Sequence, residues 1–531
     1  MKKTILLGML FLVMSAYAQE ETRFNVSFSN PITAINPIYA VTTDEAQFFT
    51  GIHEGLVQYD PKTLFPRPAI AESWDITRNN TRFTFTLRDD ARFSNGESIT
   101  AQDFIDSWMA QIDAGKDAYF AAFFDSIQGV KEYRNTPATP VGLRALDEKT
   151  LQVDLNDSVP YFLKMLCHHS FTVTHDALRS QGKNTSDVLS IPFSGPYQIE
   201  EVLDSSMTLE KNDYYWDYDN VYFTEIHARF DSTDPEKITD LYNRDMIDWV
   251  TGYYFDYETL ESPSSFVGND VFSSTFLFFK GEGVWANPRI RRALALLVDW
   301  SVLRSREFFN IPTANLIQEI PDYTPAESLD SQNIREALKI LAELGYSKSN
   351  LLPPLRIVLP SESWRAVLSP LEEWWEPLVE EFTISILEND VDSFEYYGDS
   401  SDYELGLVSW IADYTDPYAL LEMFVEGSAI NFARFSDEEF NEYIAESFSE
   451  TDRALRYEAL TNAESVLLQS AAVMPLSRHF VINLIDTERY DGWYPNILDI
   501  HPFAFLSLNP NAGPEDLVDA RESEYEFATL R

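Results

Sequence analysis

The chain has 531 residues, 45% of them hydrophobic and 24% charged, and this length is enough for two or three globular domains. Asp and Glu number 86 against 39 Lys and Arg, which gives a formal net charge of −47. Such an acidic surface repels nucleic acid and anionic lipid headgroups, which we exclude as partners, whereas it is compatible with cationic ligands or with simple solubility.

The first 18 residues have the pattern of an export signal. Two lysines precede an apolar run at 5–14 that is too short to span a bilayer, and the following small residues fit the cleavage rule. We expect cleavage after Ala18, a mature chain that starts at Gln19, and a periplasmic or secreted product. A lipoprotein would need a cysteine at the cleavage point, but the only cysteine is Cys167, which also excludes an intramolecular disulfide.

Strands and helices then alternate without a detectable internal repeat. Residues 82–87 (RFTFTL) alternate apolar residues with threonine and predict a half-buried strand, and residues 150–155 (TLQVDL) predict another. Asn95-Gly96 predicts a turn. Thr100, with Asp103 three residues later, predicts the N-cap of a helix over 101–112.

The second half contains four stretches with apolar residues at helical spacing and a further buried strand. Residues 405–410 alternate with mostly apolar faces, and Asp413 follows close behind the end of this strand. The interleaving predicts an α/β chain with mixed sheets, and the lack of a Ser/Gly-rich linker favours domains that hinge. The four predicted helices cover 287–303, capped by Asn287, then 331–346, closed by Gly345, then 436–448 and 451–471.

Signatures of catalysis and metal binding are not found in the sequence. The nucleophile-elbow, zincin, P-loop and dinucleotide-binding motifs do not occur. His168, His169 and His175 lie near Cys167, but their spacing fits no established ligand pattern, so structural roles are favoured over a zinc site. We therefore expect no enzyme, no cofactor and no metal. A secreted hydrolase with an unrecognised pair of carboxylates is an alternative that the spacing neither selects nor removes.

Six stretches occur in an order that resembles one known family. They are NPIYAVTTDEAQFFTGIHEGLVQYDP, the run from PAIAESW through TFTLRDDARFSNG to TAQDFIDSW, SGPYQIEE, LEKNDYYWD, NPRIRRALALLVD and DGWYPNILDIHPFAFLSL. Together they resemble the family 5 extracellular solute-binding proteins, the oligopeptide- and dipeptide-binding components of ABC importers. The resemblance covers nearly the whole mature chain, residues 24–508.

The resemblance implies an α/β fold of the two-lobed periplasmic binding protein type, with mixed sheets, a hinge and an extra inserted subdomain. The second lobe would close over the ligand, with the chain crossing between lobes near 275 and 485. The implied parts are lobe 1 at 19–53, 182–275 and 486–531, the inserted subdomain at 54–181, and lobe 2 at 276–485.

Peptide-binding members of this family carry a W-x-A-D-Y motif, and the residues matching it are Trp410, Ile411, Ala412, Asp413 and Tyr414. The match implies that Asp413 pairs with the α-ammonium of a peptide. Closing the lobes strips water from this carboxylate, which costs several kcal/mol unless an ammonium forms a charge-assisted hydrogen bond with it. Ligand binding and lobe closure then become one event. The alternative for Asp413 is a turn or helix-capping role.

An extended peptide can also add as a strand between the lobes. The expected edges are the strand at 406–412, with Ser409, and the early stretch Val41, Thr42 and Thr43. Trp410 would either form the wall of a ligand pocket or pack in the core. Guest side chains would lie in roomy, water-filled pockets.

These features predict an exported, monomeric substrate-binding protein that captures short peptides in an extended conformation and delivers them to the permease of an ABC importer. The net charge weakly favours peptides with basic side chains. Alternatives are a family member that binds nickel, haem, an opine or a sugar, the hydrolase already mentioned, and a surface adhesin. The chain departs from the family pattern where Ile411 replaces a cysteine found in some members, and where Asp106 replaces a frequent aromatic residue.

Overall fold

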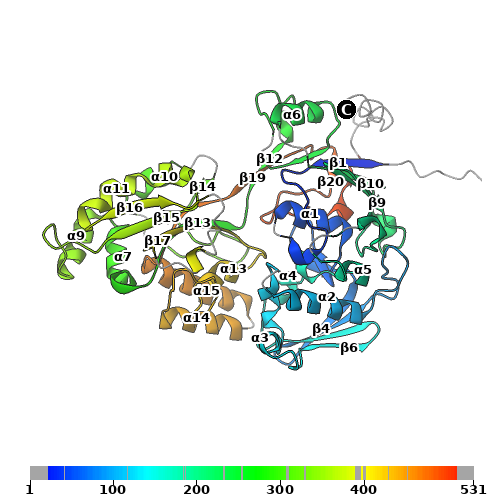
Figure 1. The fold of residues 1–531 in the computed structure, drawn as a ribbon, viewed down its shortest axis with the longest axis horizontal. Helices are drawn as coiled ribbons and strands as arrows, with labels where there is room; N and C mark the ends of the chain where they lie inside the picture. Colours follow the sequence, from blue (N-terminus) through cyan, green and yellow to red (C-terminus); the bar gives the residue numbers. More distant parts are fainter. Residues whose placement is uncertain are drawn as a thin grey trace, which may run out of the picture.

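The computed structural model describes residues 22–510 except 41, 116–117, 183–184, 186, 231–233, 253–254, 307–309, 328–330, 389–395, 399–401, 429 and 451. The expected signal peptide, Gln19 and Val41 lie outside the described residues. Figure 1 shows two bodies that lie beside each other and are joined where the chain passes from β12 to β13 and from β18 to β19. We name three parts of the molecule by their sheets. Lobe 1 contains the seven-stranded sheet, lobe 2 the six-stranded sheet and the inserted subdomain the four-stranded sheet.

Lobe 1 contains a seven-stranded mixed sheet in the order β12-β19-β11-β1-β10-β9-β8. β1 is parallel to both of its neighbours, β10 and β11, and the remaining pairs are antiparallel. The strands are β1 (Arg23–Ser27), β8 (Tyr197–Val202), β9 (Ser206–Lys211), β10 (Glu225–Arg229), β11 (Trp249–Thr251), β12 (Phe266–Asp270) and β19 (Phe480–Ile485). Helices α1 (Thr43–Ile52) and α6 (Pro235–Asn243) accompany them, with the small pairs β2–β3 (Val57–Tyr59, Pro66–Pro68) and β20–β21 (Tyr490–Asp491, Ser507–Leu508).

Lobe 2 contains a six-stranded mixed sheet in the order β14-β18-β13-β17-β15-β16. Every residue of the central strand β13 is buried, as expected for a strand covered on both faces. The strands are β13 (Ser273–Phe279), β14 (Ile311–Pro312), β15 (Leu355–Leu359), β16 (Phe382–Ile386), β17 (Leu405–Ile411) and β18 (Val473–Arg478). The helices are α7 (Pro288–Ala295), α8 (Trp300–Arg304), α9 (Ile334–Glu343), α10 (Glu362–Leu368), α11 (Pro370–Trp375), α13 (Tyr418–Leu421), α14 (Glu438–Ser449) and α15 (Arg453–Gln469).

Three of the four helices predicted in the second half are confirmed, as α9, α14 and α15. The prediction of one helix over 287–303 is wrong at its centre, because α7 ends at Ala295 and α8 begins at Trp300. The Asp299 carboxylate accepts a hydrogen bond from the Val302 amide at 3.2 Å, and it thereby starts a new helix. The apolar spacing continues across this break, so the spacing alone did not reveal it.

The inserted subdomain contains a four-stranded sheet in the order β4-β5-β7-β6. The predicted strand at 82–87 is confirmed as β5, with its phenylalanines and leucine buried and its threonines more exposed. The elements are β4 (Ala71–Thr77), β5 (Arg82–Leu87), β6 (Leu143–Asp147), β7 (Thr150–Asp154), α2 (Ala101–Ala114), α3 (Val130–Asn135), α4 (Phe162–Met165) and α5 (Asp176–Arg179).

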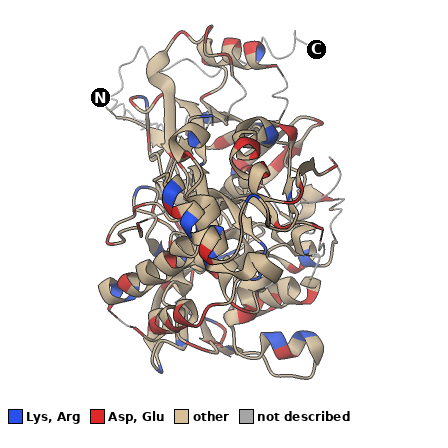
Figure 2. Ribbon diagram, turned by 90° about the vertical axis from the view of Figure 1, so that its left-hand side faces the viewer, with Lys and Arg blue, Asp and Glu red and all other residues tan. Residues whose placement is uncertain are grey.

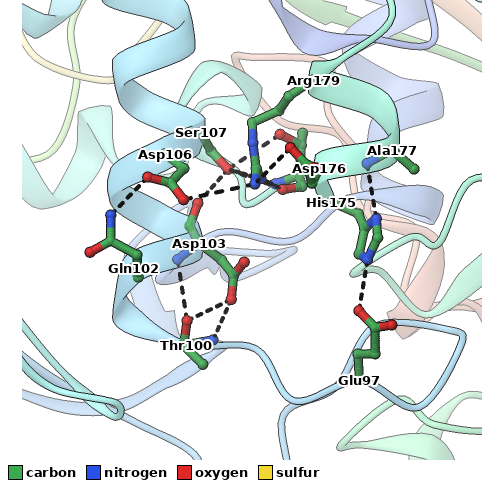
Figure 3. Close-up of polar contacts among 11 residues, drawn as sticks. Glu97, Thr100, Gln102, Asp103, Asp106, Ser107, His175, Asp176, Ala177 and Arg179 are labelled. Carbon is green, nitrogen blue, oxygen red and sulfur yellow. Dashed lines mark hydrogen bonds and ion pairs between the residues drawn. The ribbon is translucent and has the colours of Figure 1, made fainter.

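The TAQDFIDSW stretch, prominent in the resemblance, has a structural role here (Figure 3). Thr100 and Asp103 form the predicted capping box at the start of α2. The Ser107 hydroxyl donates to the Asp103 carbonyl oxygen at 2.7 Å, and Arg179 contacts the same hydroxyl at 3.3 Å. Asp106 accepts a hydrogen bond from Gln102 at 2.7 Å, so it acts as a polar residue on the helix surface rather than as a stacking residue.

The chain crosses between lobes 1 and 2 at 271–272 and at 479, where strands of one sheet give way to strands of the other. These positions lie a few residues before 275 and 485, near which the resemblance implied the crossings. The crossings are adjacent, since the Val271 amide donates to the His479 carbonyl oxygen at 3.0 Å. Two short, adjacent crossings are typical of a hinge.

Two further features concern the molecule as a whole, namely the length of its helices and the distribution of its charged residues. Within the described ranges, the helices are all too short or too polar to cross a membrane. Figure 2 shows acidic positions spread over the ribbon, with basic positions scattered among them.

Candidate ligand-binding site

A cavity of about 130 Å³ lies where lobe 1, the inserted subdomain and lobe 2 meet. Its walls come from α1, from residues 53–59, 167–172 and 498–504, and from the end of β17 at 411–413. Because these segments are far apart in the sequence, the cavity is created by the tertiary fold. Its position between the lobes makes it the candidate ligand site.

Helix α1 supplies one wall through its helical spacing. Thr43, Ala46, Phe49 and Thr50 lie on one face of the helix, and all four line the cavity. The helix starts there because Thr42 and Glu45 form a capping box, in which the Glu45 amide donates to the Thr42 hydroxyl at 3.1 Å. Thr43 therefore lies in a helix rather than on a strand edge, whereas Val41 lies outside the described residues and Thr42 has an extended backbone, so the expected pairing edge at these two residues stays a prediction. Thr42 is used as a cap, and Thr43 faces the cavity from a helix.

The C-terminal stretch forms the wall beside α1. The Asn496 side-chain oxygen accepts hydrogen bonds from the amides of Leu498 at 3.1 Å and Ile500 at 3.4 Å. This fixes an irregular segment in which alternate residues, from Leu498 and Ile500 to Pro502 and Ala504, line the cavity. The segment belongs to the last stretch of the family resemblance, so that motif contributes directly to the site.

Asp413 lies at the lobe 2 side of the cavity. The strand before it is fixed where the Ala412 amide donates to the Phe272 carbonyl oxygen at 2.8 Å. The Asp413 side chain is partly buried and lines the cavity. Burial raises the pKa of Asp413 to about 7, and in the described part of the chain no cation or hydrogen-bond donor to this carboxylate lowers it again. The site thus presents a desolvated carboxylate that lacks a counter-ion.

Asp416, three residues later, has the opposite environment. It is 2% exposed, and its two oxygens accept hydrogen bonds from Arg456 at 2.8 Å each. Although burial opposes it, Arg456 lowers the pKa of Asp416, and the Tyr418 amide also donates to this carboxylate at 3.1 Å. Asp416 therefore has a structural role in the turn before α13. The contrast shows that the lack of a partner at Asp413 is not a general property of this loop.

A second acidic side chain, Glu422, is electrostatically coupled to Asp413. Burial, together with the nearby Asp413 charge, raises the pKa of Glu422 to about 8. The one hydrogen bond to Glu422 comes from the Tyr414 hydroxyl at 3.3 Å. A cation bound at Asp413 would relieve both the desolvation of Asp413 and its repulsion of Glu422.

The lobe 1 side of the cavity is polar but carries no positive charge. His53, His168 and His169 are buried, and burial lowers the pKa of His53 to about 4 and that of His169 to about 3, so these rings are neutral at pH 7. Glu54 accepts hydrogen bonds from the Tyr215 hydroxyl at 2.6 Å and from the Trp216 ring nitrogen at 2.7 Å. No lysine or arginine of the described ranges lines the cavity.

The structure brings some of the predicted site residues together and separates others. Ile411, Ala412, Asp413 and Thr43 line the cavity, whereas Ser409, Trp410, Tyr414 and Thr42 do not. The Ser409 hydroxyl bonds to Thr275 at 2.8 Å, and Trp410 packs against the apolar core. Tyr414 is buried and stacks on Tyr161.

The far end of β17 offers a free edge for an extended ligand. β17 pairs with β13 along its whole length, but β15 pairs with it only at Leu405 and Gly406. Over the described residues, no strand pairs with the other side of β17 from Leu407 to Ile411, although the Leu407 amide donates to the Tyr397 hydroxyl at 3.2 Å and only the last residues of the strand are accessible. Backbone groups next to Asp413 are therefore available for strand addition.

Sequence reasoning missed most of the cavity wall that lies opposite lobe 2. His168, His169 and Cys167 were interpreted as ordinary structural residues, yet all three line the cavity. Glu54 and Tyr59 also line it. No local pattern marks these residues, although the helical spacing of Thr43, Ala46, Phe49 and Thr50 would have indicated a shared face.

Comparisons with known proteins agree with this architecture. Residues 66–432 match a family model described as "Bacterial extracellular solute-binding proteins, family 5 Middle". The periplasmic oligopeptide-binding protein OppA of Escherichia coli is 26% identical over 488 residues, which cover 87% of this chain and 88% of that protein. The oligopeptide-binding protein OppA of Bacillus subtilis is 25% identical over 487 residues, 86% and 87% of the two chains.

Solved structures show the same fold at lower identity. The unliganded open form of the periplasmic murein tripeptide binding protein MppA has a TM-score of 0.75 at 21% identity, over 92% of this chain and 98% of that one. Haemophilus influenzae OppA in complex with RPPGFSPFR has a TM-score of 0.71 at 20% identity, over 92% and 99%. The fold is that of two-lobed periplasmic binding proteins.

Proposed function

Since the chain belongs to the bacterial extracellular solute-binding proteins of family 5, we propose that it binds short peptides between its lobes and delivers them to the permease of an ABC importer. The observation that carries the proposal is the Asp413 carboxylate, which faces the cavity and has no counter-ion among the described residues. A peptide α-ammonium supplies the missing charge and donates hydrogen bonds to it. The names of the relatives, which are oligopeptide-binding proteins, support the same ligand class.

Binding combines this ion pair with main-chain contacts. The ligand backbone adds along the free edge of β17, which is indifferent to side-chain identity. Lobes 1 and 2 close about the crossings at 271–272 and 479, and closure removes water from the ion pair. The closed state is favourable mainly when an ammonium occupies the site, because an unpaired buried carboxylate is costly.

The cavity next to Asp413 accepts the side chain of the first peptide residue. Its volume of about 130 Å³ is close to the ~150 Å³ of an apolar cavity that takes up benzene, so one side chain of moderate size fills it. The neutral histidines and the two lining carboxylates, Asp413 and Glu54, disfavour an acidic side chain there. These walls favour a peptide whose first residue is uncharged. The net charge alone had instead suggested peptides with basic side chains.

We also propose that the protein is exported, with cleavage after Ala18, and acts as a monomer without a lipid anchor, a cofactor or catalytic activity. We propose that lobe 1, the inserted subdomain and lobe 2 are separate domains, each with one of the three larger sheets as its core. The two crossings between the sheets of lobes 1 and 2 then serve as the hinge.

Native mass spectrometry of gently purified protein tests the ligand class. We expect a heterogeneous set of short peptides to co-purify with wild type and to be depleted in Asp413→Asn. A uniform non-peptide mass, or no uptake of peptide at saturating concentration, would instead support the alternative of a non-peptide solute.

A further inference from the structure

The inserted subdomain contacts the loop that carries Asp413, across the boundary between the two bodies. Figure 1 places α4 of the subdomain next to α13 of lobe 2 at this boundary. Tyr161, directly before α4, and Tyr414, directly after Asp413, belong to one continuous apolar cluster. Residues 413–418 therefore pack against two bodies at once.

Aromatic stacking forms the apolar part of this contact. The Tyr161 ring lies parallel to the Tyr414 ring, with centroids 4.9 Å apart and an interplanar angle of 4°. It also stacks on Tyr418, with centroids 5.3 Å apart at 26°. Tyr161 and Tyr414 are 7% and 1% exposed, so separating the lobes would expose both rings.

Lys164 forms the polar part. Its ammonium donates a hydrogen bond to the Thr415 carbonyl oxygen and lies 3.9 Å from the Asp416 carboxylate. Asp416 is held from within lobe 2 by the paired hydrogen bonds from Arg456. The loop is thus fixed on one side by its own lobe and on the other by the inserted subdomain. A third contact, from the Tyr59 hydroxyl to the Asp413 carbonyl oxygen, measures 3.5 Å.

None of these contacts uses the Asp413 carboxylate itself. They hold its backbone and its neighbours and leave the charged group facing the cavity. We propose that Tyr161 and Lys164 are positioning residues, which fix the Asp413 loop in the closed arrangement and add a contribution to lobe closure that does not depend on ligand. The effect on peptide affinity rests on the proposed function, whereas the effect on lobe closure does not.

Lys164→Met tests the proposal, because it keeps the apolar stem and removes the ammonium. Lys149→Met is the matched control, since Lys149 donates to the carbonyl oxygens of Arg88 at 2.9 Å and Ile99 at 2.8 Å, both within the inserted subdomain. Small-angle X-ray scattering of ligand-free protein reports the mean separation of the lobes. Stopped-flow kinetics with fluorescently labelled trialanine, labelled at its C-terminus, separates association from dissociation.

We expect ligand-free Lys164→Met to have a larger radius of gyration than wild type and to release the peptide about ten times faster, with association changed less than twofold. Lys164→Arg should restore most of both properties, and Tyr161→Ala should act in the same direction as Lys164→Met. Lys149→Met should match wild type. Equal radii and release rates in wild type and Lys164→Met, or the same change in Lys149→Met, would overturn the proposal. If wild type does not bind trialanine, the proposed function is in question and the scattering comparison alone decides the positioning role.

Discussion

Replacing the Asp413 carboxylate with the neutral amide of Asn keeps the shape of the side chain and removes its charge. Removing one partner from a buried, hydrogen-bonded charge pair costs about 2–5 kcal/mol. Asp413 is only partly buried before ligand binds, so we expect the lower end of this range. A loss of about 2–3 kcal/mol corresponds to an increase in Kd of about 30- to 150-fold for a peptide with a free N-terminus.

Isothermal titration calorimetry with trialanine and with its N-acetylated form provides the assay. Wild type should prefer the free peptide strongly, since acetylation removes the ammonium that pairs with Asp413. Asp413→Asn should bind the two forms about equally. If the variant keeps the wild-type preference, or weakens both peptides by the same factor, the ammonium role assigned to Asp413 is refuted.

Asp416→Asn is the matched control in the same loop, and its effect on stability should have the opposite sign. Asp413→Asn removes a carboxylate without a counter-ion, so the ligand-free variant should melt at the wild-type temperature or above it. Asp416→Asn breaks a buried pair with Arg456, which costs about 3–5 kcal/mol and should lower the melting temperature clearly. Differential scanning calorimetry of the ligand-free proteins distinguishes the two outcomes.

Four further results are expected. Since burial raises the pKa of Asp413 to about 7, acidification from pH 7 to pH 5 protonates the carboxylate that the ammonium needs, and the wild-type Kd should rise by about 50-fold while that of Asp413→Asn changes little. Because of the same raised pKa, the folded, ligand-free protein retains a proton on Asp413 between about pH 4 and pH 7 that the unfolded chain has lost. The contribution of this group to the free energy of unfolding should therefore fall as the pH rises across that window. Thermal melts at several pH values measure this change. A tripeptide that begins with glutamate should bind about tenfold more weakly in calorimetry than trialanine, because the cavity walls in the described chain provide two carboxylates and no lysine or arginine; equal affinity would contradict the placement of the first side chain. Gly492→Ala should lower the melting temperature, because Gly492 has a φ of +87° and an added Cβ would lie 1.9 Å from the Phe505 carbonyl oxygen; an unchanged melting temperature would show that the C-terminal wall can shift.

Local patterns predicted much of the secondary structure. The strand at 82–87, the capping box of Thr100 and Asp103, and the three helices α9, α14 and α15 each depend on spacing or capping within a short segment. One prediction failed for a reason that the structure explains. The break between α7 and α8 depends on one capping carboxylate, Asp299, inside an uninterrupted apolar pattern, and periodicity does not detect it.

The candidate site was predicted less completely than the fold. The family resemblance pointed to Asp413, and the structure places this residue at the cavity. The resemblance could not distinguish Asp413 from Asp416 by environment, because Arg456 is 40 residues away from Asp416 in the sequence. Only the folded chain shows that one aspartate has a cation and that the other faces a cavity without one.

The sequence by itself determined the class of the molecule, since the ordered motifs and the periodic segments each reside in contiguous residues. The tertiary structure decided the chemistry of the site. Burial, counter-ions and the shape of the cavity arise where α1, the segments 167–172 and 498–504, and the end of β17 meet. These properties depend on distances between residues that lie hundreds of positions apart, and a linear pattern does not contain such distances.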